Sequence, residues 1–208
     1  MRILLIDNHD SFTWNLVELL KYVCKCNVNI VMPEAVRISE IMHYDRILFS
    51  PGPGLPREQP EMYKVLTEVE RLYTAGERII PVFGVCLGMQ AIARYYGGQL
   101  YNLPEVMHGQ PRRLNILQPG HFLFRGIKSG TEVGLYHSWA VEKKSLPASL
   151  DLLAVSDDGI IMALAHKISP VSGVQFHPES IMTPAGSRML KNWIDSTENK
   201  KPLPDGSG

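Results

Sequence analysis

Apolar runs and amphipathic stretches alternate along the first half of the chain. Four short apolar runs predict buried strands at Arg2–Ile6, Val28–Val31, Arg46–Phe49 and Ile79–Val85. Apolar residues at helical spacing predict helices over residues 10–23, 60–74 and 86–96, the first of them capped by Asp10. Strands that alternate with helices in this order predict a doubly wound α/β fold with a mostly parallel sheet.

The second half changes to shorter apolar runs, separated by turns rich in glycine, proline and serine. These runs predict strands at Leu114–Leu117, Val133–Tyr136, Asp151–Val155, Ile160–Ala165 and Gly173–Phe176. We expect them to form an antiparallel extension of the sheet, followed by a helix over residues 184–194. Residues 1–196 are expected to form one domain, and the polar tail at 197–208 is expected to be disordered.

Composition and charge narrow the class of protein. With 208 residues and 45% hydrophobic content, the chain is long enough for one globular domain with a full core. Its 21 basic and 21 acidic residues leave no positive surplus for binding nucleic acid or an anionic membrane. The N-terminal apolar run stops at Asp7, and no run is long enough to span a bilayer. We therefore expect a cytoplasmic protein without a signal peptide.

The three cysteines have no framework spacing and predict a reduced protein with at least one free thiol. Cys24 and Cys26 are too close together for a useful disulfide loop. Cys86 has a different setting, because Gly84-Val85-Cys86-Leu87-Gly88 has the layout of a strand-to-helix nucleophile elbow with cysteine in place of serine. Flanking glycines permit the sharp turn, and a helix N-terminus favours the thiolate. A buried structural cysteine is the alternative.

A histidine and a glutamate near the end of the last predicted strand can serve as a base and its orienting partner. Pro178 holds His177 extended, and side chains two positions apart in an extended segment lie on one side. Glu179 can therefore reach the ring of His177 and orient it. A surface turn with solvated side chains is the alternative. No zinc-binding spacing occurs, so we expect no metal.

The segment Ser50-Pro51-Gly52-Pro53-Gly54 follows the third predicted strand. Proline fixes φ and removes donors, whereas glycine permits positive φ and close approach of a ligand. Such a loop can aim the N–H of Gly54 at an oxyanion, with the N–H of Leu87 as the second donor. An ordinary tight turn is the alternative, and no Gly-Lys-Ser/Thr follows that would indicate a phosphate loop.

These motifs together resemble the three signatures of class I, triad-type glutamine amidotransferases: Gly84–Gln90, Val174–Ser180 and Ser50–Gly54. Asp7–Leu16 and Met107–Gly109 are similar to segments of the small subunits of anthranilate synthase and aminodeoxychorismate synthase. The resemblance covers nearly the whole chain, and the joint occurrence of the motifs in this order is highly specific. It implies a flavodoxin-like fold.

The resemblance implies a role for each matching residue. Cys86 would be the nucleophile, His177 the general base and acid, and Glu179 its orienting partner. Gly54 and Leu87 would supply the N–H groups of the oxyanion hole. Contacts with the substrate glutamine would come from Gly52, Pro53, Gln90, Ser138 and Trp139.

The resemblance also implies a reaction and a partner. Glutamine would be hydrolysed to glutamate, and the ammonia would pass to a larger chorismate-binding synthase subunit. Any magnesium would belong to that subunit, and this chain would need no cofactor. The branch stays open between anthranilate synthesis, aminodeoxychorismate for folate synthesis, and a subunit that serves both.

Three other functions share part of the pattern. A stand-alone cysteine γ-glutamyl hydrolase would use the same elbow without the Asp7–Leu16 segment, and a non-catalytic binding subunit would not need the cysteine, histidine and glutamate. Chain length and Asp7–Leu16 speak against an amidotransferase of the purine, pyrimidine or histidine pathways. The chain departs from the family at Met89, where histidine is frequent, and at Trp139, where leucine is frequent. We expect the second change to alter the glutamine pocket or the contact with the partner.

Overall fold

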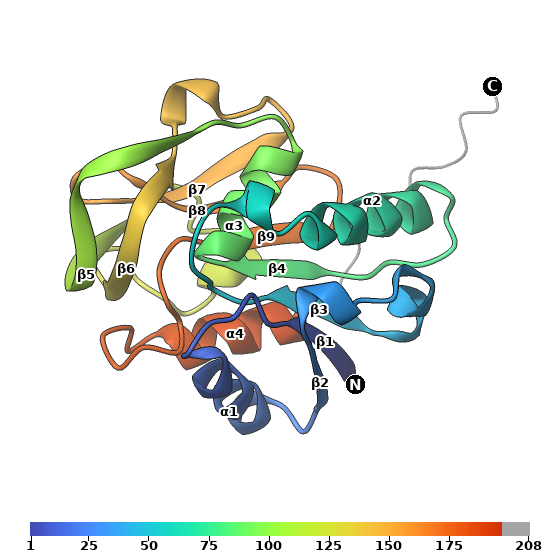
Figure 1. Ribbon diagram of the computed structural model, residues 1–208. Helices are drawn as coiled ribbons and strands as arrows, with labels where there is room; N and C mark the ends of the chain where they lie inside the picture. Colours follow the sequence, from blue (N-terminus) through green and yellow to red (C-terminus); the bar gives the residue numbers. More distant parts are fainter. Residues whose placement is uncertain (197–208) are drawn as a thin grey trace.

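The computed structural model describes residues 1–196, which form a nine-stranded mixed sheet flanked by α-helices (Figure 1). The strand order across the sheet is β2-β1-β3-β4-β9-β8-β7-β5-β6. The strands span Arg2–Ile6 (β1), Asn27–Val31 (β2), Arg46–Phe49 (β3), Val82–Val85 (β4), Leu100–Ile116 (β5), Glu132–Val141 (β6), Leu150–Ser156 (β7), Ile161–His166 (β8) and Val171–Val174 (β9). The α-helices span Thr13–Val23 (α1), Glu61–Thr74 (α2), Leu87–Tyr95 (α3) and Gly186–Asp195 (α4).

The central parallel strands β1, β3, β4 and β9 are buried on both faces, whereas the edge strand β2 is partly exposed. Strands β2, β1, β3, β4 and β9 run parallel to one another in that order. In β1, Ile3 and Leu5 belong to the core beneath α1 and α4, whereas Leu4 and Ile6 belong to the core beneath α2 and α3. Successive side chains of the central strands therefore meet opposite apolar layers, which is why these strands are nearly continuous apolar runs. The predicted doubly wound α/β fold is confirmed.

The antiparallel extension is also confirmed, but one of its strands is far longer than predicted. Strand β8 is antiparallel to β9 and β7, and β7 is antiparallel to β5. The strand predicted at Leu114–Leu117 is only the end of β5, which begins at Leu100 and pairs with β6. About half of β5 is exposed, it contains two prolines, and its register shifts twice, so no regular apolar alternation marks it in the sequence.

Two local boundaries differ from the prediction for identifiable reasons. Asp10 does not cap α1, which begins at Thr13; instead, Asp7 Oδ1 accepts hydrogen bonds from Thr13 Oγ1 at 2.7 Å and from the Asp10 backbone N–H at 3.1 Å. Strand β4 begins at Val82 rather than Ile79, because Pro81 has no N–H for the ladder.

The interpretation of Cys24 and Cys26 as unbridged cysteines is wrong. The structure joins them in a disulfide with a Cα–Cα distance of 5.3 Å, which lies within the usual range for a bridge. The connection between α1 and β2 turns sharply enough to bring the two sulfurs together. Among the described residues, Cys86 has a free thiol, which confirms the prediction of at least one.

None of the helices in residues 1–196 is long and apolar enough to cross a membrane. The expected domain boundary at residue 196 stays a prediction. The tail expected to be disordered, 197–208, lies outside the described residues.

Candidate active site

The elbow at Cys86 has the strained geometry that its sequence predicts. Cys86 follows β4 directly, has φ 53° and ψ −104°, and is succeeded at once by α3. A non-glycine residue with positive φ is uncommon and persists only where its surroundings hold it. Its backbone is held by a hydrogen bond from the Cys86 N–H to Val174 O at 2.8 Å, so the elbow is tied to β9. The side chain is buried, with 6% of the residue exposed.

Two glycines allow the elbow to form because the chain passes too close to itself for a Cβ atom. A Cβ on Gly84 would lie 2.4 Å from the carbonyl carbon of Gly88, and a Cβ on Gly88 would lie 2.7 Å from Phe49 O. The flanking glycines of the motif therefore serve the packing of α3 onto β4 and β3. This packing presents Cys86 at the N-terminus of α3, where the helix favours a negative charge.

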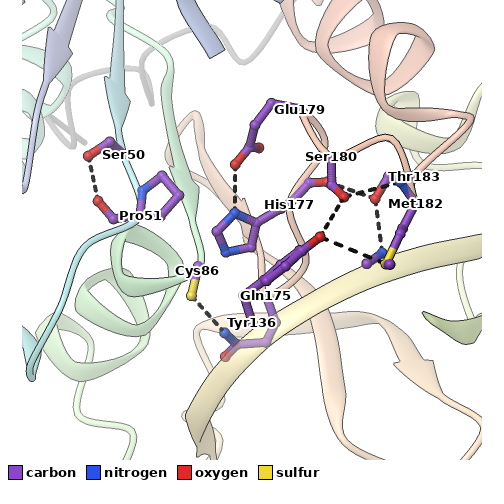
Figure 2. A network of polar contacts seen from close by, with 11 residues as sticks. Ser50, Pro51, Cys86, Tyr136, Gln175, His177, Glu179, Ser180, Met182 and Thr183 are labelled. Atoms are coloured by element: carbon purple, nitrogen blue, oxygen red, sulfur yellow. Dashed lines mark hydrogen bonds and ion pairs between the residues drawn. The ribbon is translucent and has the colours of Figure 1, made fainter. Parts of the chain in front are cut away.

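His177 and Glu179 form a buried hydrogen-bonded pair next to this elbow. His177 Nδ1 donates to Glu179 Oε1 at 2.6 Å, and their side chains are 5% and 1% exposed. Figure 2 shows the His177 ring between Glu179 and Cys86. Glu179 reaches the ring from a turn rather than from an extended segment, because the Ser180 N–H and Thr183 Oγ1 donate to His177 O at 3.1 and 2.7 Å.

The surroundings of His177 favour its charged form. Burial acts in the opposite direction, but the neighbouring Cys86 sulfur and Glu179 carboxylate outweigh it, and the pKa of His177 rises well above its usual value. The other ring nitrogen, Nε2, has no hydrogen-bond partner within residues 1–196. The arrangement can therefore hold a proton on the ring beside a thiolate, which is the charge state of an activated cysteine nucleophile.

Two buried glutamines connect the Cys86 sulfur to the backbone of strand β6. Gln175 Nε2 donates to Cys86 Sγ at 3.4 Å (Figure 2), and Gln175 Oε1 accepts from Gln90 Nε2 at 3.1 Å. Gln90 Nε2 also donates to Trp139 O at 2.8 Å. Both hydrogens of the Gln90 amide are thus directed at protein oxygens. Gln175 was not among the predicted site residues, although it lies two positions before His177 in the same motif.

A cavity of about 160 Å³ lies in front of Cys86 and gathers the residues that the motifs single out. It is lined by Gly52, Pro53, Gly54, Cys86, Leu87, Gln90, Tyr136, His137, Ser138 and Trp139. All five predicted glutamine contacts and both predicted oxyanion residues therefore meet at one place. Gly54 has φ +77°, the positive value expected of this loop.

Tyr136, His137 and Phe12 are neighbours of the site that the sequence did not single out. Tyr136 and Phe12 pack their rings against His177 with centroid distances of 4.9 and 6.3 Å. Burial is the main cause that lowers the pKa of His137 to about 4, so this ring is neutral. His137 Nδ1 lies 2.9 Å from Trp139 O and must donate to it, which leaves Nε2 as an acceptor beside the cavity.

Residues 1–196 contain no group of three or more histidine, cysteine, aspartate or glutamate side chains that could hold a metal ion. The residues that line the cavity instead carry a thiol, an amide, hydroxyls and aromatic rings. Such a set can carry out nucleophilic attack by sulfur on a carbonyl or carboxamide carbon, with the imidazole as proton carrier.

Comparisons with known proteins find a matching family, a matching fold and several relatives. The family described as glutamine amidotransferase class-I matches residues 4–196. Among solved structures, one chain of a provisionally assigned GMP synthase from Thermoplasma acidophilum superposes with a TM-score of 0.80. It is 23% identical, and the match covers 93% of this chain and 92% of that one.

Three relatives are similar over nearly their whole length. A provisionally assigned anthranilate synthase component II from Haemophilus influenzae is 40% identical over 196 residues, 93% of this chain and 96% of the relative. Aminodeoxychorismate/anthranilate synthase component 2 from Bacillus subtilis is 39% identical, over 93% of this chain and 96% of the relative. Aminodeoxychorismate synthase component 2 from Escherichia coli is 39% identical, over 92% of this chain and 98% of the relative.

Proposed function

The chain belongs to the class I glutamine amidotransferase family, and from this premise we propose that Cys86, His177 and Glu179 hydrolyse the side-chain amide of glutamine. The observation that carries the proposal is the buried His177–Glu179 pair beside a strained cysteine that faces a cavity. In that order the three side chains supply a nucleophile, a proton carrier and an orienting carboxylate.

The first half of the reaction releases ammonia. The Cys86 thiolate attacks the carboxamide carbon, and the carbonyl oxygen takes up the negative charge. The backbone N–H groups of Gly54 and Leu87 stabilise this oxyanion, and loss of one such donor costs about 3–4 kcal/mol in comparable sites. The C–N bond then breaks, the proton on His177 passes to the departing nitrogen, and ammonia leaves a glutamyl thioester on Cys86.

The second half returns the enzyme to its starting state. His177, now neutral, takes a proton from water, and the resulting hydroxide attacks the thioester carbon. The C–S bond breaks, glutamate leaves, and the thiolate and the protonated ring are restored. Glu179 stabilises the charged ring at both stages through its hydrogen bond to Nδ1. Gly52, Pro53, Gln90, Ser138 and Trp139 hold the substrate in the cavity.

The ammonia is passed to a larger partner protein, a synthase that aminates chorismate. Three relatives of this chain are named as second components of anthranilate or aminodeoxychorismate synthases, and the Bacillus subtilis name covers both. Ammonia in bulk water is protonated and loses its nucleophilicity, so direct transfer between the docked proteins preserves it. We assign the chain to anthranilate synthesis first, with aminodeoxychorismate synthesis for folate, or both, as the alternative. Magnesium belongs to the partner, and the complex works in the cytoplasm.

Reconstitution with a chorismate-using synthase tests this function. Cys86→Ala should abolish glutamine-dependent product and leave ammonia-dependent product intact, because only the first needs the nucleophile. A chain with both Cys24 and Cys26 changed to serine is the matched control and should keep both activities. Loss of both activities in Cys86→Ala would show a structural role for the cysteine. Equal glutamine turnover with and without the partner would contradict the coupling between the two proteins.

A further inference from the structure

Buried polar atoms without a partner gather at two places in residues 1–196. Five of them lie at or beside the candidate active site: Asn8 Oδ1, Asp10 Oδ2, His137 Nε2, His177 Nε2 and Glu179 Oε2. The other four belong to the side chains of Arg46, Arg78 and Trp193. All three of these residues line a second cavity, which has a volume of about 360 Å³. Native proteins leave few such atoms unpaired, so each cluster requires an explanation.

The second cavity lies at the opposite end of the parallel strands from Cys86. Arg46 opens β3, Val171 opens β9, and Pro81 immediately precedes β4. These three residues line the cavity together with Trp193 of α4 and Phe122 of the loop before β6. Its volume falls in the range of small-molecule sites, and none of its described lining residues belongs to the cavity in front of Cys86.

Arg46 is the buried charge at this place. The residue is 2% exposed, and its guanidinium lies over the Trp193 ring at 5.5 Å. Nη2 donates to Ile194 O at 2.6 Å, but Nε and Nη1 have no acceptor within residues 1–196. Burial lowers the pKa of Arg46 to about 10, although the charges of Asp195 and Asp45 act in the opposite direction. A buried guanidinium with one carbonyl partner is incompletely compensated.

The acids nearby do not complete the compensation. Asp45 lines the cavity, but its carboxylate is paired with Arg78 Nη2 at 3.1 Å and accepts the Arg2 N–H at 2.7 Å. Asp195 is paired with Lys191 at 2.8 Å. Both carboxylates act on the charge of Arg46, but they are ion-paired with Arg78 and Lys191 respectively. An anion supplied from outside the described residues would complete the compensation of this charge.

The unpaired atoms also define the chemistry of that anion. Arg46 Nε and Nη1, Arg78 Nε and Trp193 Nε1 are all N–H donors, so a ligand must bring acceptor oxygens. Trp193, Phe122 and Pro81 provide an apolar wall beside them. We propose that the second cavity binds a small organic carboxylate, with its charged end at Arg46 and its apolar body against Trp193 and Phe122. A guanidinium fork matches the two oxygens of a carboxylate.

The donors are themselves shielded from solvent, so binding must turn the Arg46 fork toward the cavity. The indole N–H of Trp193 gains or changes a partner in the same event. Its NMR resonance therefore reports occupancy directly, and it can be assigned with Trp14→Phe and Trp139→Phe chains. This readout needs neither glutamine nor a synthase, so its outcome is separate from that of the proposed function.

Titration of the full chain with benzoate tests the site. We expect the Trp193 indole resonance to shift and to saturate at millimolar benzoate. Benzamide, which has the same ring without the charge, should give at least a tenfold weaker response, and so should inorganic phosphate, which lacks the apolar body. Equal shifts with benzamide would mean a merely apolar cavity. Equal shifts with phosphate would mean a general anion site. Either result, or no shift with benzoate, overturns the proposal.

Arg46 variants locate the charge that binds. Arg46→Met should weaken benzoate binding at least tenfold, whereas Arg37→Met, at an exposed arginine outside the cavity, should leave it unchanged. Arg46→Lys keeps a positive charge but loses the fork, and it serves if Arg46→Met does not fold; it should bind benzoate several times more weakly. Native affinity in Arg46→Met or in Arg46→Lys would overturn the assignment.

Discussion

The two ends of the parallel strands bury unpaired polar groups of opposite kinds. At the carboxyl end, beside Cys86, the unpaired atoms include acceptors and ring nitrogens, such as Glu179 Oε2 and His137 Nε2. At the amino end, beside Arg46, every unpaired atom is an N–H donor. A site that moves protons needs both donors and acceptors, whereas a site that holds an anion needs donors alone.

The two ends also differ in how tightly the backbone is packed. At the carboxyl end, Gly84, Gly88 and Gly186 each sit where a Cβ would lie less than 3 Å from backbone atoms of another segment. The cavity there measures about 160 Å³, against about 360 Å³ at the amino end. Small changes at the carboxyl end should therefore cost much more activity than changes of the same kind at the amino end.

The largest difference is expected when the charge of Glu179 is removed without changing its shape. Glu179→Gln keeps an oxygen near His177 Nδ1 but no longer stabilises the charged ring. We expect kcat/KM for glutamine to fall about 10²–10⁴-fold, as for the orienting carboxylate of comparable triads. The measurement is glutamate release with the partner synthase present.

Arg78→Gln is the matched change at the amino end. Arg78 pairs with Asp45 at a half-exposed position, so we expect a loss of less than about 1 kcal/mol in stability and hydrolysis within about twofold of the native chain. Similar losses of glutamine hydrolysis in Glu179→Gln and Arg78→Gln would contradict the proposed difference between the two ends.

Gly186 tests the tight packing at the carboxyl end. A Cβ on this residue would lie 1.8 Å from Pro178 O, between His177 and Glu179 in the chain. Gly186→Ala should therefore displace the turn that carries both side chains and lower the free energy of unfolding by more than about 3 kcal/mol. Gly120→Ala is the control, because its Cβ would meet nothing within 4 Å and its φ is not positive. Denaturant unfolding of both chains measures the difference, and equal stabilities would contradict the packing argument.

His137, at the carboxyl end, makes the free energy of unfolding depend on pH. Its pKa is lowered from 6.5 to about 4 in the folded state, so between these pH values the unfolded chain binds a proton on His137 and the folded chain does not. The contribution of the neutral His137 ring to the free energy of unfolding is fully present above pH 6.5 and is lost as the pH falls toward 4. The loss approaches about 3 kcal/mol. His137→Asn should flatten the stability profile between pH 7 and 4, whereas the exposed His43→Asn should not. An unchanged slope in His137→Asn would show that this ring is not the group that titrates.

The sequence predicts the parallel half of the fold well because its central strands are buried on both faces. Ile3 to Ile6 must all be apolar, and Arg46–Phe49 has the predicted bounds. The first part of β5 could not be found, because an exposed strand interrupted by a proline and by register shifts leaves no periodic signal. The Cys24–Cys26 bridge was excluded on sequence spacing, which carries no information about the local turn.

Within the site, short motifs predicted the local geometry, but the sequence did not reveal contacts between residues that lie far apart along the chain. Glycines around Cys86 and the spacing of His177 and Glu179 indicate local geometry, and the structure brings these segments together. Arg46 lies in a strand whose apolar neighbours make it look like an edge position, yet it is buried against Trp193 almost 150 residues later. Only the three-dimensional packing of α4 onto the sheet reveals that pair.

The smallest effect at the carboxyl end is expected from Gln175, which touches the sulfur without carrying a proton. Gln175→Met keeps a similar length and removes the donor to Cys86 Sγ. A hydrogen bond to a charged group contributes about 1.5–3 kcal/mol, and part of it is retained in the transition state, so we expect about a tenfold fall in kcat with little change in KM. The rate at which iodoacetamide alkylates Cys86 should also fall at a fixed pH, and this readout does not depend on glutamine binding. Gln59→Met, in the loop before α2, is the control with the same chemical change. A native alkylation rate in Gln175→Met would show that this amide orders the cavity wall without activating the sulfur.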